Sequence, residues 1–329
     1  MSKPRVFVTR RLLESGLSLV QEFCEADIWF GEMPPSREEI LGKIVGQDGL
    51  LCLLTDRIDA EVMDAAGPGL KVISNCAVGV DNVDVSAATA RSIPVGNTPG
   101  VLTEATADMT FALLMAAARR VVEGERQVRS GGWKTWSLDN LLGADFAGAT
   151  LGLVGFGRIG RAVARRASGF EMRVIFTDSS PTAPQPSVEA LQVDLDTLLH
   201  ESDFVSLHTP LTDETRGMMN AAAFAKMKAT AVLVNTSRGP VVDQPALYQA
   251  LKSHQIFAAA LDVTVPEPLP TDSPLLTLEN CIIVPHIASA SRQTRQNMSR
   301  MAAENLIAGL KGEHLPNCVN PEVYGREQG

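Results

Sequence analysis

Short apolar runs alternate with helix-like segments along the first hundred residues. Runs typical of buried strands lie at 6–8, 28–30, 50–54, 72–74 and 93–95. Segments 12–23 and 37–45 have helical spacing, and Ser36 with Glu39 forms a capping-box pattern before the second of them. This alternation predicts a small α/β domain with a parallel sheet.

A strongly apolar helical pattern follows from Thr103 to about Val122. A helix that is apolar on most sides is expected to be buried between domains or between subunits. Segment 131–148 is then irregular and contains Trp133 and Trp136, which favour core packing, a subunit contact or a pocket wall.

A second alternating pattern begins at Ala149. Its predicted strands are 150–154, 173–177, 204–208, 232–235, 259–263 and 282–284, mostly separated by helical segments. Residues 292–311 predict a final helix, and 179–187 predict a proline-rich surface loop. The pattern therefore predicts a second α/β unit.

Composition and charge narrow the possible functions. The 329 residues suit two domains, and the formal charge of -9 argues against nucleic acid or an anionic membrane as the main partner. Five widely spaced cysteines indicate free thiols in a reducing compartment, and no ligand spacing predicts a metal. With no signal-peptide core or apolar run of membrane-spanning length, we expect a cytoplasmic enzyme.

A glycine-rich turn carries the cofactor prediction. Gly155, Gly157 and Gly160 follow a predicted strand and open a helix, the setting in which backbone amides bind a pyrophosphate. Asp178 ends the next predicted strand, where it is expected to accept hydrogen bonds from the ribose hydroxyls and to repel a 2′-phosphate. The sequence therefore favours NAD, while hydroxyl donors at Thr177 and Ser179 leave NADP possible.

Three polar residues after later strands carry the chemistry. Arg238, Glu267 and His286 each follow an apolar run typical of a buried strand, and open α/β sheets place their reactive groups at strand ends. A fixed cation can bind a substrate carboxylate, and an imidazole kept protonated by a carboxylate can protonate a carbonyl oxygen. These residue types suit reduction of a 2-keto acid.

The motifs together resemble those of the D-isomer-specific 2-hydroxyacid dehydrogenases, over essentially the whole chain. The matching segments are the glycine turn 155–160, Asn-Thr-Ser-Arg-Gly-Pro-Val-Val-Asp at 235–243, Ala-Leu-Asp-Val at 260–263, Pro-Glu-Pro-Leu at 266–269 and Pro-His-Ile-Ala-Ser-Ala at 285–290. Gly-Gly-Trp-Lys-Thr-Trp at 131–136, Ser-Pro-Leu-Leu-Thr-Leu at 273–278 and Asn-Cys-Val-Asn-Pro at 317–321 are most similar to glyoxylate/hydroxypyruvate reductases and to 2-ketogluconate reductases. Ala260, Thr264 and Ala288 depart from the family's usual residues without touching the proposed chemistry.

The resemblance implies two flavodoxin- or Rossmann-like domains with parallel sheets. Residues 1–100 and 290–329 would form a discontinuous substrate-binding domain, and 101–289 the dinucleotide-binding domain. It also implies a homodimer supported by the helix after Thr103, with Trp136 as the candidate to reach the neighbouring active site.

The resemblance further implies roles for individual residues. His286 would be the proton donor, Glu267 its partner and Arg238 the carboxylate anchor, while Leu54 and the backbone amides around Val78 and Gly79 would contact the substrate. Implied cofactor contacts are Thr106, Gly155, Gly157, Arg158, Ile159, Gly160, Asp178, His208, Thr209, Pro210, Thr236, Ser237, Arg238, Asp262, His286 and Ser289.

Three other functions compete with this interpretation. A non-catalytic NAD-sensing protein of the same fold is disfavoured because the acid, its partner and the anchor are all present. A phosphoglycerate dehydrogenase is disfavoured because no regulatory domain follows the final helix, and formate dehydrogenases place Gln at the position of Glu267. The choice between glyoxylate, hydroxypyruvate and 2-ketogluconate stays open.

Overall fold

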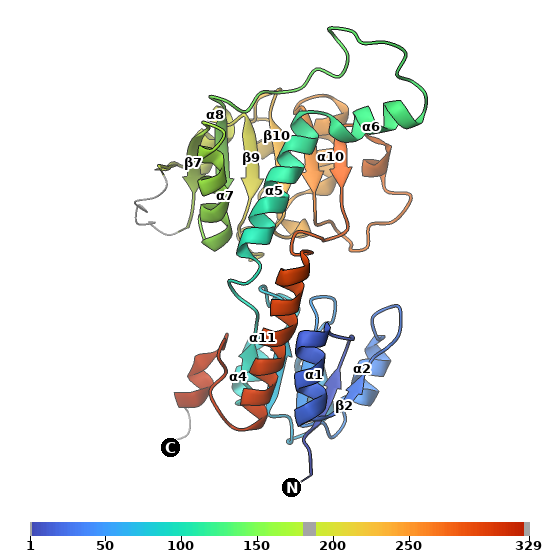
Figure 1. Ribbon diagram of the computed structural model, residues 1–329. Coiled ribbons are helices and arrows are strands. Elements are labelled where there is room, and N and C mark those ends of the chain that lie inside the picture. Colours follow the sequence, from blue (N-terminus) through green and yellow to red (C-terminus); the bar gives the residue numbers. More distant parts are fainter. Residues whose placement is uncertain (1, 180–188, 326–329) are drawn as a thin grey trace. The chain divides into compact units, whose positions relative to one another are not determined.

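The computed structural model describes residues 2–179 and 189–325, which form two compact units. Unit 1 consists of Met1–Leu102 and Ala290–Gly329, and unit 2 of Thr103–Ser289. Each unit has a fully parallel sheet with helices on both faces (Figure 1). The predicted fold class, two α/β units with parallel sheets, is confirmed.

The sheet of unit 1 has the strand order β2-β1-β3-β4-β5. Its elements are β1 (Arg5–Val8), α1 (Glu14–Phe23), β2 (Glu25–Ile28), α2 (Arg37–Lys43), β3 (Gly49–Cys52), α3 (Ala60–Ala66), β4 (Val72–Asn75), α4 (Val85–Ala90), β5 (Val95–Gly96), α11 (Arg292–Leu310) and a 3₁₀ helix (Pro321–Gly325). This is the order of a flavodoxin-like doubly wound sheet.

The strands of unit 1 are apolar along their length because both faces of the sheet are covered. Phe7 packs on one face against the side chains of α2 and α3, whereas its neighbours Val6 and Val8 pack on the other against α1 and α11. Successive strand residues point to opposite faces, so a sheet covered on both sides requires a continuous apolar run. The capping box predicted at Ser36 and Glu39 is present at the start of α2.

The sheet of unit 2 has the order β12-β11-β10-β9-β6-β7-β8. Its elements are α5 (Thr103–Ala118), α6 (Val121–Arg129), β6 (Thr150–Val154), α7 (Arg158–Ser168), β7 (Arg173–Thr177), β8 (Leu191–Gln192), α8 (Leu195–Glu201), β9 (Phe204–Leu207), α9 (Ala221–Phe224), β10 (Val232–Asn235), a 3₁₀ helix (Gly239–Val241), α10 (Gln244–Lys252), β11 (Ala258–Leu261), a 3₁₀ helix (Pro274–Thr277) and β12 (Cys281–Ile283). The order reverses between β6 and β9, and such a switch point is where doubly wound sheets bind dinucleotides.

Apolar layers cover both faces of the unit 2 sheet. Helices α5 and α7 cover the face that includes Leu151 and Leu153, while α8 and α10 cover the face that includes Val154 and Leu233. Because every strand is parallel to its neighbours, the loops after the strands all leave from one edge of the sheet. The predicted reactive residues of unit 2 lie in these loops.

The single helix predicted from 103 to about 122 is wrong. Helix α5 ends at Ala118, and Arg120 has a left-handed backbone with φ of 50° before α6 begins at Val121. No glycine or proline marks this break in the sequence, so the apolar pattern alone could not locate it.

Two further predictions need correction or fall outside the described residues. Strand β2 spans Glu25–Ile28 instead of 28–30, because an edge strand paired only to β1 buries just Ile28 and shows no apolar run. The short edge strand β8 was missed for the same reason. Most of the predicted proline-rich loop 179–187 lies outside the described residues.

No described helix combines the length and the apolar character needed to cross a bilayer.

Candidate active site

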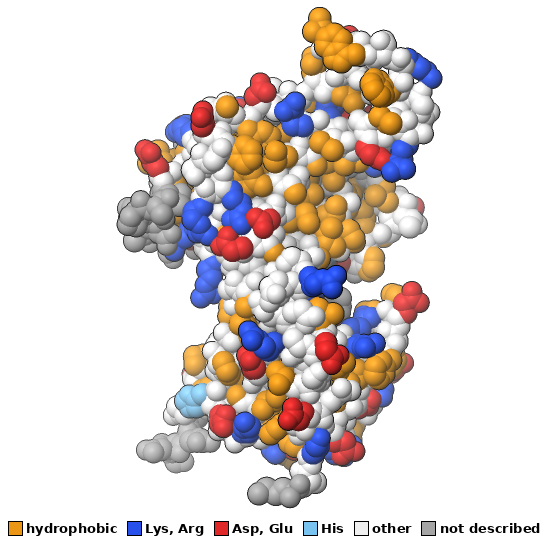
Figure 2. Space-filling view, viewed as in Figure 1, with side chains coloured by type: hydrophobic (Ala, Val, Ile, Leu, Met, Phe, Trp, Pro, Cys, Tyr) orange, Lys and Arg blue, Asp and Glu red, His pale blue; other side chains and the backbone are white. Residues whose placement is uncertain are grey.

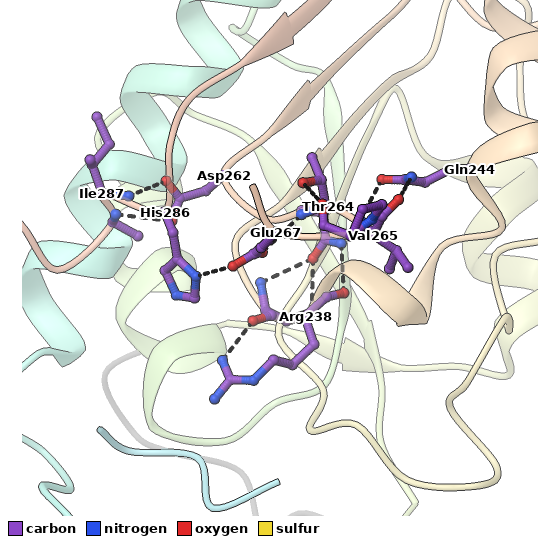
Figure 3. A network of polar contacts seen from close by, with 12 residues as sticks. Arg238, Gln244, Asp262, Thr264, Val265, Glu267, His286 and Ile287 are labelled. Atoms are coloured by element: carbon purple, nitrogen blue, oxygen red, sulfur yellow. Dashed lines mark hydrogen bonds and ion pairs between the residues drawn. The ribbon is translucent and has the colours of Figure 1, made fainter. Parts of the chain in front are cut away.

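His286 and Glu267 form the central contact of the site. The Nδ1 atom of His286 lies 2.9 Å from Oε2 of Glu267, and the two side chains point toward each other (Figure 3). His286 lies in the loop after β12 and Glu267 in the loop after β11, two neighbouring strands. The parallel sheet thus brings together residues 19 positions apart in sequence.

The surroundings of Glu267 favour its charged form. Burial alone would raise the pKa of Glu267, but hydrogen bonds from His286 and from the Thr264 amide, together with the charges of His286 and Arg238, bring this pKa below its ordinary value. The Thr264 N–H donates to Oε1 of Glu267 at 2.9 Å. Glu267 is therefore a carboxylate at neutral pH and can accept a hydrogen bond from Nδ1 of His286.

Asp262 fixes the loop that carries His286. Its carboxylate accepts hydrogen bonds from the backbone amides of Ile287 at 2.6 Å and Ala288 at 2.9 Å, and its carbonyl accepts one from the His286 amide at 2.9 Å. These contacts hold His286 in a left-handed backbone conformation with φ of 51°. The pKa of Asp262 lies above its ordinary value, because burial raises it by more than the hydrogen bonds from the two amides lower it. Asp262 was predicted as a cofactor contact, which stays a prediction, and the structure shows both its carboxylate oxygens bound to this loop.

Arg238 lies in a tight turn after β10. The fully buried Asn235 donates to the carbonyl of Arg238 at 2.9 Å and accepts from the amide and hydroxyl of Ser237, at 3.0 and 2.8 Å. The guanidinium donates to the Ser237 carbonyl at 2.9 Å. This turn fixes the backbone from which the predicted carboxylate anchor projects.

The turn of Arg238 touches the loop of Glu267 through backbone atoms. A Cβ atom on Gly239 would lie 2.0 Å from the carbonyl oxygen of Thr264, closer than any side chain permits. Thr264 in turn donates its amide to Glu267. Glycine at 239 therefore allows Arg238 and Glu267 to lie on adjoining loops of one sheet edge.

The glycine-rich turn is tight, and it is open in front of the helix that follows it. Gly155 has φ of 94°, and a Cβ atom there would lie 2.8 Å from the carbonyl carbon and oxygen of His208. Among the described residues, a Cβ atom at Gly157 would meet nothing within 4 Å, and no side chain caps the helix that begins at Arg158. Open space in front of uncapped helix amides suits a pyrophosphate. Ile159 and Gly160 follow in the first turn of this helix.

The loops after β7 and β9 flank this turn. The carboxylate of Asp178 accepts a hydrogen bond from the Phe156 amide at 2.7 Å, which places it beside the glycine turn. His208, followed by Thr209 and Pro210, has its Nε2 atom 2.9 Å from the hydroxyl of Ser206. Among the described residues its buried Nδ1 atom has no hydrogen-bond partner. Burial lowers the pKa of His208 to about 3, so its ring is neutral and suited to the cofactor edge but not to acid catalysis.

Thr106 and Thr236 meet through α5. Thr110, one turn after Thr106, accepts or donates a hydrogen bond with the hydroxyl of Thr236 at 3.0 Å and donates to the Thr106 carbonyl at 2.9 Å. Thr106 and Thr236 are both buried. The start of α5 therefore packs on the turn after β10, and Ser289, also a predicted cofactor contact, ends unit 2 after β12.

Three predicted substrate contacts lie in unit 1. Leu54 follows β3, and Val78 and Gly79 follow β4, so both loops leave neighbouring strands at one edge of the sheet. All three residues are half-buried.

Sequence reasoning missed the residues that hold these loops. Asn97 donates to the Val78 carbonyl at 2.7 Å in unit 1, and in unit 2 Gln244 accepts from the Val265 amide at 2.8 Å and donates to its carbonyl (Figure 3). Only their positions in the sequence could have indicated this role. Asn97 lies just after a strand and Gln244 at the start of a helix, each near a predicted site loop. Among the described residues no group of three or more His, Cys, Asp or Glu side chains is arranged to hold a metal ion.

This arrangement supplies what a carbonyl reduction needs from a protein. It contains a carboxylate-paired imidazole, a guanidinium on the adjoining loop, and a glycine turn with open amides at the same edge of the sheet. An acid, an anion anchor and a dinucleotide cradle together suit acid-assisted reduction of an anionic carbonyl compound.

Comparisons with known proteins agree with this chemistry. Residues 111–288 match the family model for the NAD binding domain of D-isomer specific 2-hydroxyacid dehydrogenases. A glyoxylate reductase of Korarchaeum cryptofilum is 56% identical, covering 98% of this chain and 97% of the relative. A glyoxylate reductase/hydroxypyruvate reductase of Mus musculus is 46% identical, covering 95% and 97%. The crystal structure of TT0316 protein from Thermus thermophilus superposes with a TM-score of 0.90 at 52% identity, covering 96% of this chain and 99% of that one.

Proposed function

This chain belongs to the D-isomer specific 2-hydroxyacid dehydrogenase family, and on that premise we propose that it reduces glyoxylate or hydroxypyruvate to the 2-hydroxy acid. The product has the D configuration where the new carbon is chiral. The observation that carries the proposal is the 2.9 Å contact between His286 and Glu267 on the sheet edge that also carries Arg238. The names of relatives at 46–56% identity support the choice of substrate.

The proposed mechanism assigns one task to each side chain. Arg238 is the proposed partner of the substrate carboxylate, and the backbone amides of Val78 and Gly79 are proposed as further donors to it. His286 donates a proton to the carbonyl oxygen from Nε2, because Nδ1 faces Glu267. Glu267 holds the imidazole in its protonated form and fixes the ring orientation. The bound dinucleotide supplies the two electrons as a hydride.

We propose NAD as the preferred dinucleotide, with NADP as the alternative. The family model establishes an NAD(P)-binding domain. Asp178, held beside the glycine turn by the Phe156 amide, supports NAD because its charge would repel a 2′-phosphate.

We also propose a homodimer, supported by α5, the helix that begins at Thr103, and extended by α6 and the segment that follows it. Hydrophobic side chains gather there on the surface of unit 2 (Figure 2), and Trp136 and Leu138 are 75% and 82% exposed. Exposed apolar groups of this size favour burial against a partner. Trp136 is the candidate to reach the neighbouring active site.

Five unpaired cysteines support a cytoplasmic location.

One set of initial rates tests this function. Glyoxylate, hydroxypyruvate and 2-ketogluconate are each assayed with NADH and with NADPH, and light scattering measures the mass in solution. We expect the highest kcat/KM with glyoxylate or hydroxypyruvate and NADH, in a dimer. If NADH binds but no 2-keto acid oxidises it, the alternative of a non-catalytic NAD-sensing protein would be favoured. A tenfold or greater preference for NADPH would overturn the assignment of Asp178.

A further inference from the structure

The loop after β4 has its carbonyl oxygens fixed by other parts of unit 1. The carbonyl of Ala77 accepts from the Thr98 amide at 2.9 Å, and the carbonyl of Val78 accepts from Nδ2 of Asn97 at 2.7 Å. The carbonyl of Gly79 accepts from Nδ2 of Asn75 at 2.9 Å. Three consecutive peptide groups therefore have their acceptors occupied.

The amides of the same loop are not used in this way. Within the part of the chain that the structure describes, the N–H groups of Val78 and Gly79 donate to no protein acceptor. A trans peptide directs its N–H opposite to its C=O. Because Thr98 and Asn97 hold the carbonyls of two consecutive peptides, the amides of Val78 and Gly79 point together away from segment 97–98. Neighbouring amides aligned in this manner bind anions.

Asn97 is itself fixed by two other asparagines. Its amide donates to the Asn317 carbonyl at 3.2 Å, and its carbonyl accepts from Nδ2 of Asn305 at 2.9 Å. Asn305 is fully buried on α11, and its Oδ1 accepts from the Asn317 amide at 3.0 Å. The side chain that donates to the Val78 carbonyl therefore belongs to a residue whose backbone is anchored in the core of unit 1.

We propose that Asn97 is a positioning residue for recognition of the substrate carboxylate, acting by holding the Val78–Gly79 peptide with its N–H outward. This inference rests on the proposed function, since it requires that these amides receive a carboxylate. Asn97 contacts the loop backbone, and the loop amides contact the substrate. Asn75 supports the next peptide in the same way and also donates to Oδ1 of Asn82 at 2.9 Å.

Two variants at position 97 test this role. Asn97→Ala removes the donor, and Asn97→Asp keeps the shape but places an acceptor against the Val78 carbonyl. For both we expect KM for glyoxylate to rise about tenfold or more, the effect of one lost hydrogen bond, while kcat changes less than about threefold. The Kd for NADH, followed by fluorescence, should not change.

A second readout separates carboxylate recognition from general loosening of the fold. The inhibition constant of oxalate, which carries carboxylates, should rise in parallel with KM. The kcat/KM for glycolaldehyde, a carbonyl compound without a carboxylate, should stay near the wild-type value. Selectivity for the acid over the aldehyde therefore falls in the variants.

Asn320→Ala is the matched control in the same unit. Asn320 is fully buried, donates to Thr89 at 2.9 Å and Ile93 at 3.0 Å, and accepts from the Val95 amide at 2.8 Å, but makes none of the contacts to residues 77–80. We expect a lower Tm and an unchanged KM.

The outcomes distinguish the two proposals. Active wild-type enzyme with unchanged KM in both Asn97 variants would contradict the positioning role alone. Equal losses for glyoxylate and glycolaldehyde would also contradict it. Wild-type protein that neither reduces nor binds a 2-keto acid would contradict the proposed function and this inference together.

Discussion

The imidazole of His286 faces the carboxylate of Glu267 across 2.9 Å, from loops that follow neighbouring strands. The pair is partly accessible, with side-chain exposures of 25% for His286 and 33% for Glu267, so the ring can be reached from solvent. The consequences of this pairing for catalysis can be measured.

Replacing His286 by alanine removes the proposed proton donor. We expect kcat to fall by about 100- to 10,000-fold, the usual contribution of a general acid, while the Kd for NADH stays the same. Steady-state rates and NADH fluorescence measure the two effects. His200→Ala, at an exposed position, is the control, and near-normal turnover of His286→Ala would exclude this residue as the acid.

Glu267→Gln should change the pH dependence of reduction. The pKa of Glu267 lies below its ordinary value, so the carboxylate is charged throughout the neutral range and stabilises the protonated imidazole. Without that charge, we expect the alkaline limb of the kcat profile to move to lower pH. Rates from pH 5 to 9 test this, and superimposable profiles would count against the pairing.

Arg238→Lys keeps the charge and removes the planar fork. We expect KM for the keto acid to rise by about 10- to 100-fold, because an ammonium group cannot make the two parallel hydrogen bonds that a carboxylate accepts from a guanidinium. Arg173→Lys, at the opposite edge of the sheet in an ion pair with Glu201, is the matched control. Equal KM values in both variants would contradict a role of Arg238 in substrate binding.

Asp178→Asn tests the cofactor preference. Asparagine still offers an oxygen to the Phe156 amide but carries no charge, so the fold of the turn is retained. The ratio of kcat/KM for NADPH to that for NADH should rise by about tenfold or more as repulsion of the 2′-phosphate disappears. A constant ratio would mean that another group selects the cofactor.

His208 should make the protein sensitive to acid. Its pKa is about 3 in the folded protein and near 6.5 when unfolded, so the unfolded state binds the extra proton between these values. Its stabilisation is complete above pH 6.5 and is lost by about 1.4 kcal/mol per pH unit as the pH falls toward 3. Between pH 6.5 and 4.5 wild type should lose about 2 kcal/mol more than His208→Gln in urea unfolding. His200→Gln should follow wild type, and parallel curves for all three proteins would refute the prediction.

The sequence predicted the strands that are buried on both faces, because such strands must be apolar along their length. It failed at β2 and β8, edge strands that need few buried side chains, and at Arg120, where the helix break has no glycine or proline. The motifs located the strand-end loops that carry the candidate residues. They could not show the contacts of Asn97 or Gln244, because hydrogen bonds between loops depend on which strands become neighbours.

The backbone contact between Gly239 and Thr264 has a consequence for how such a site can change. The spacing between the loop of Arg238 and the loop of Glu267 depends on the absence of a single methyl group, since any larger residue at 239 would push the two loops apart. Side chains on these loops can therefore change while the backbone contact at residue 239 keeps the proposed carboxylate anchor and the proposed proton donor at a set distance from each other.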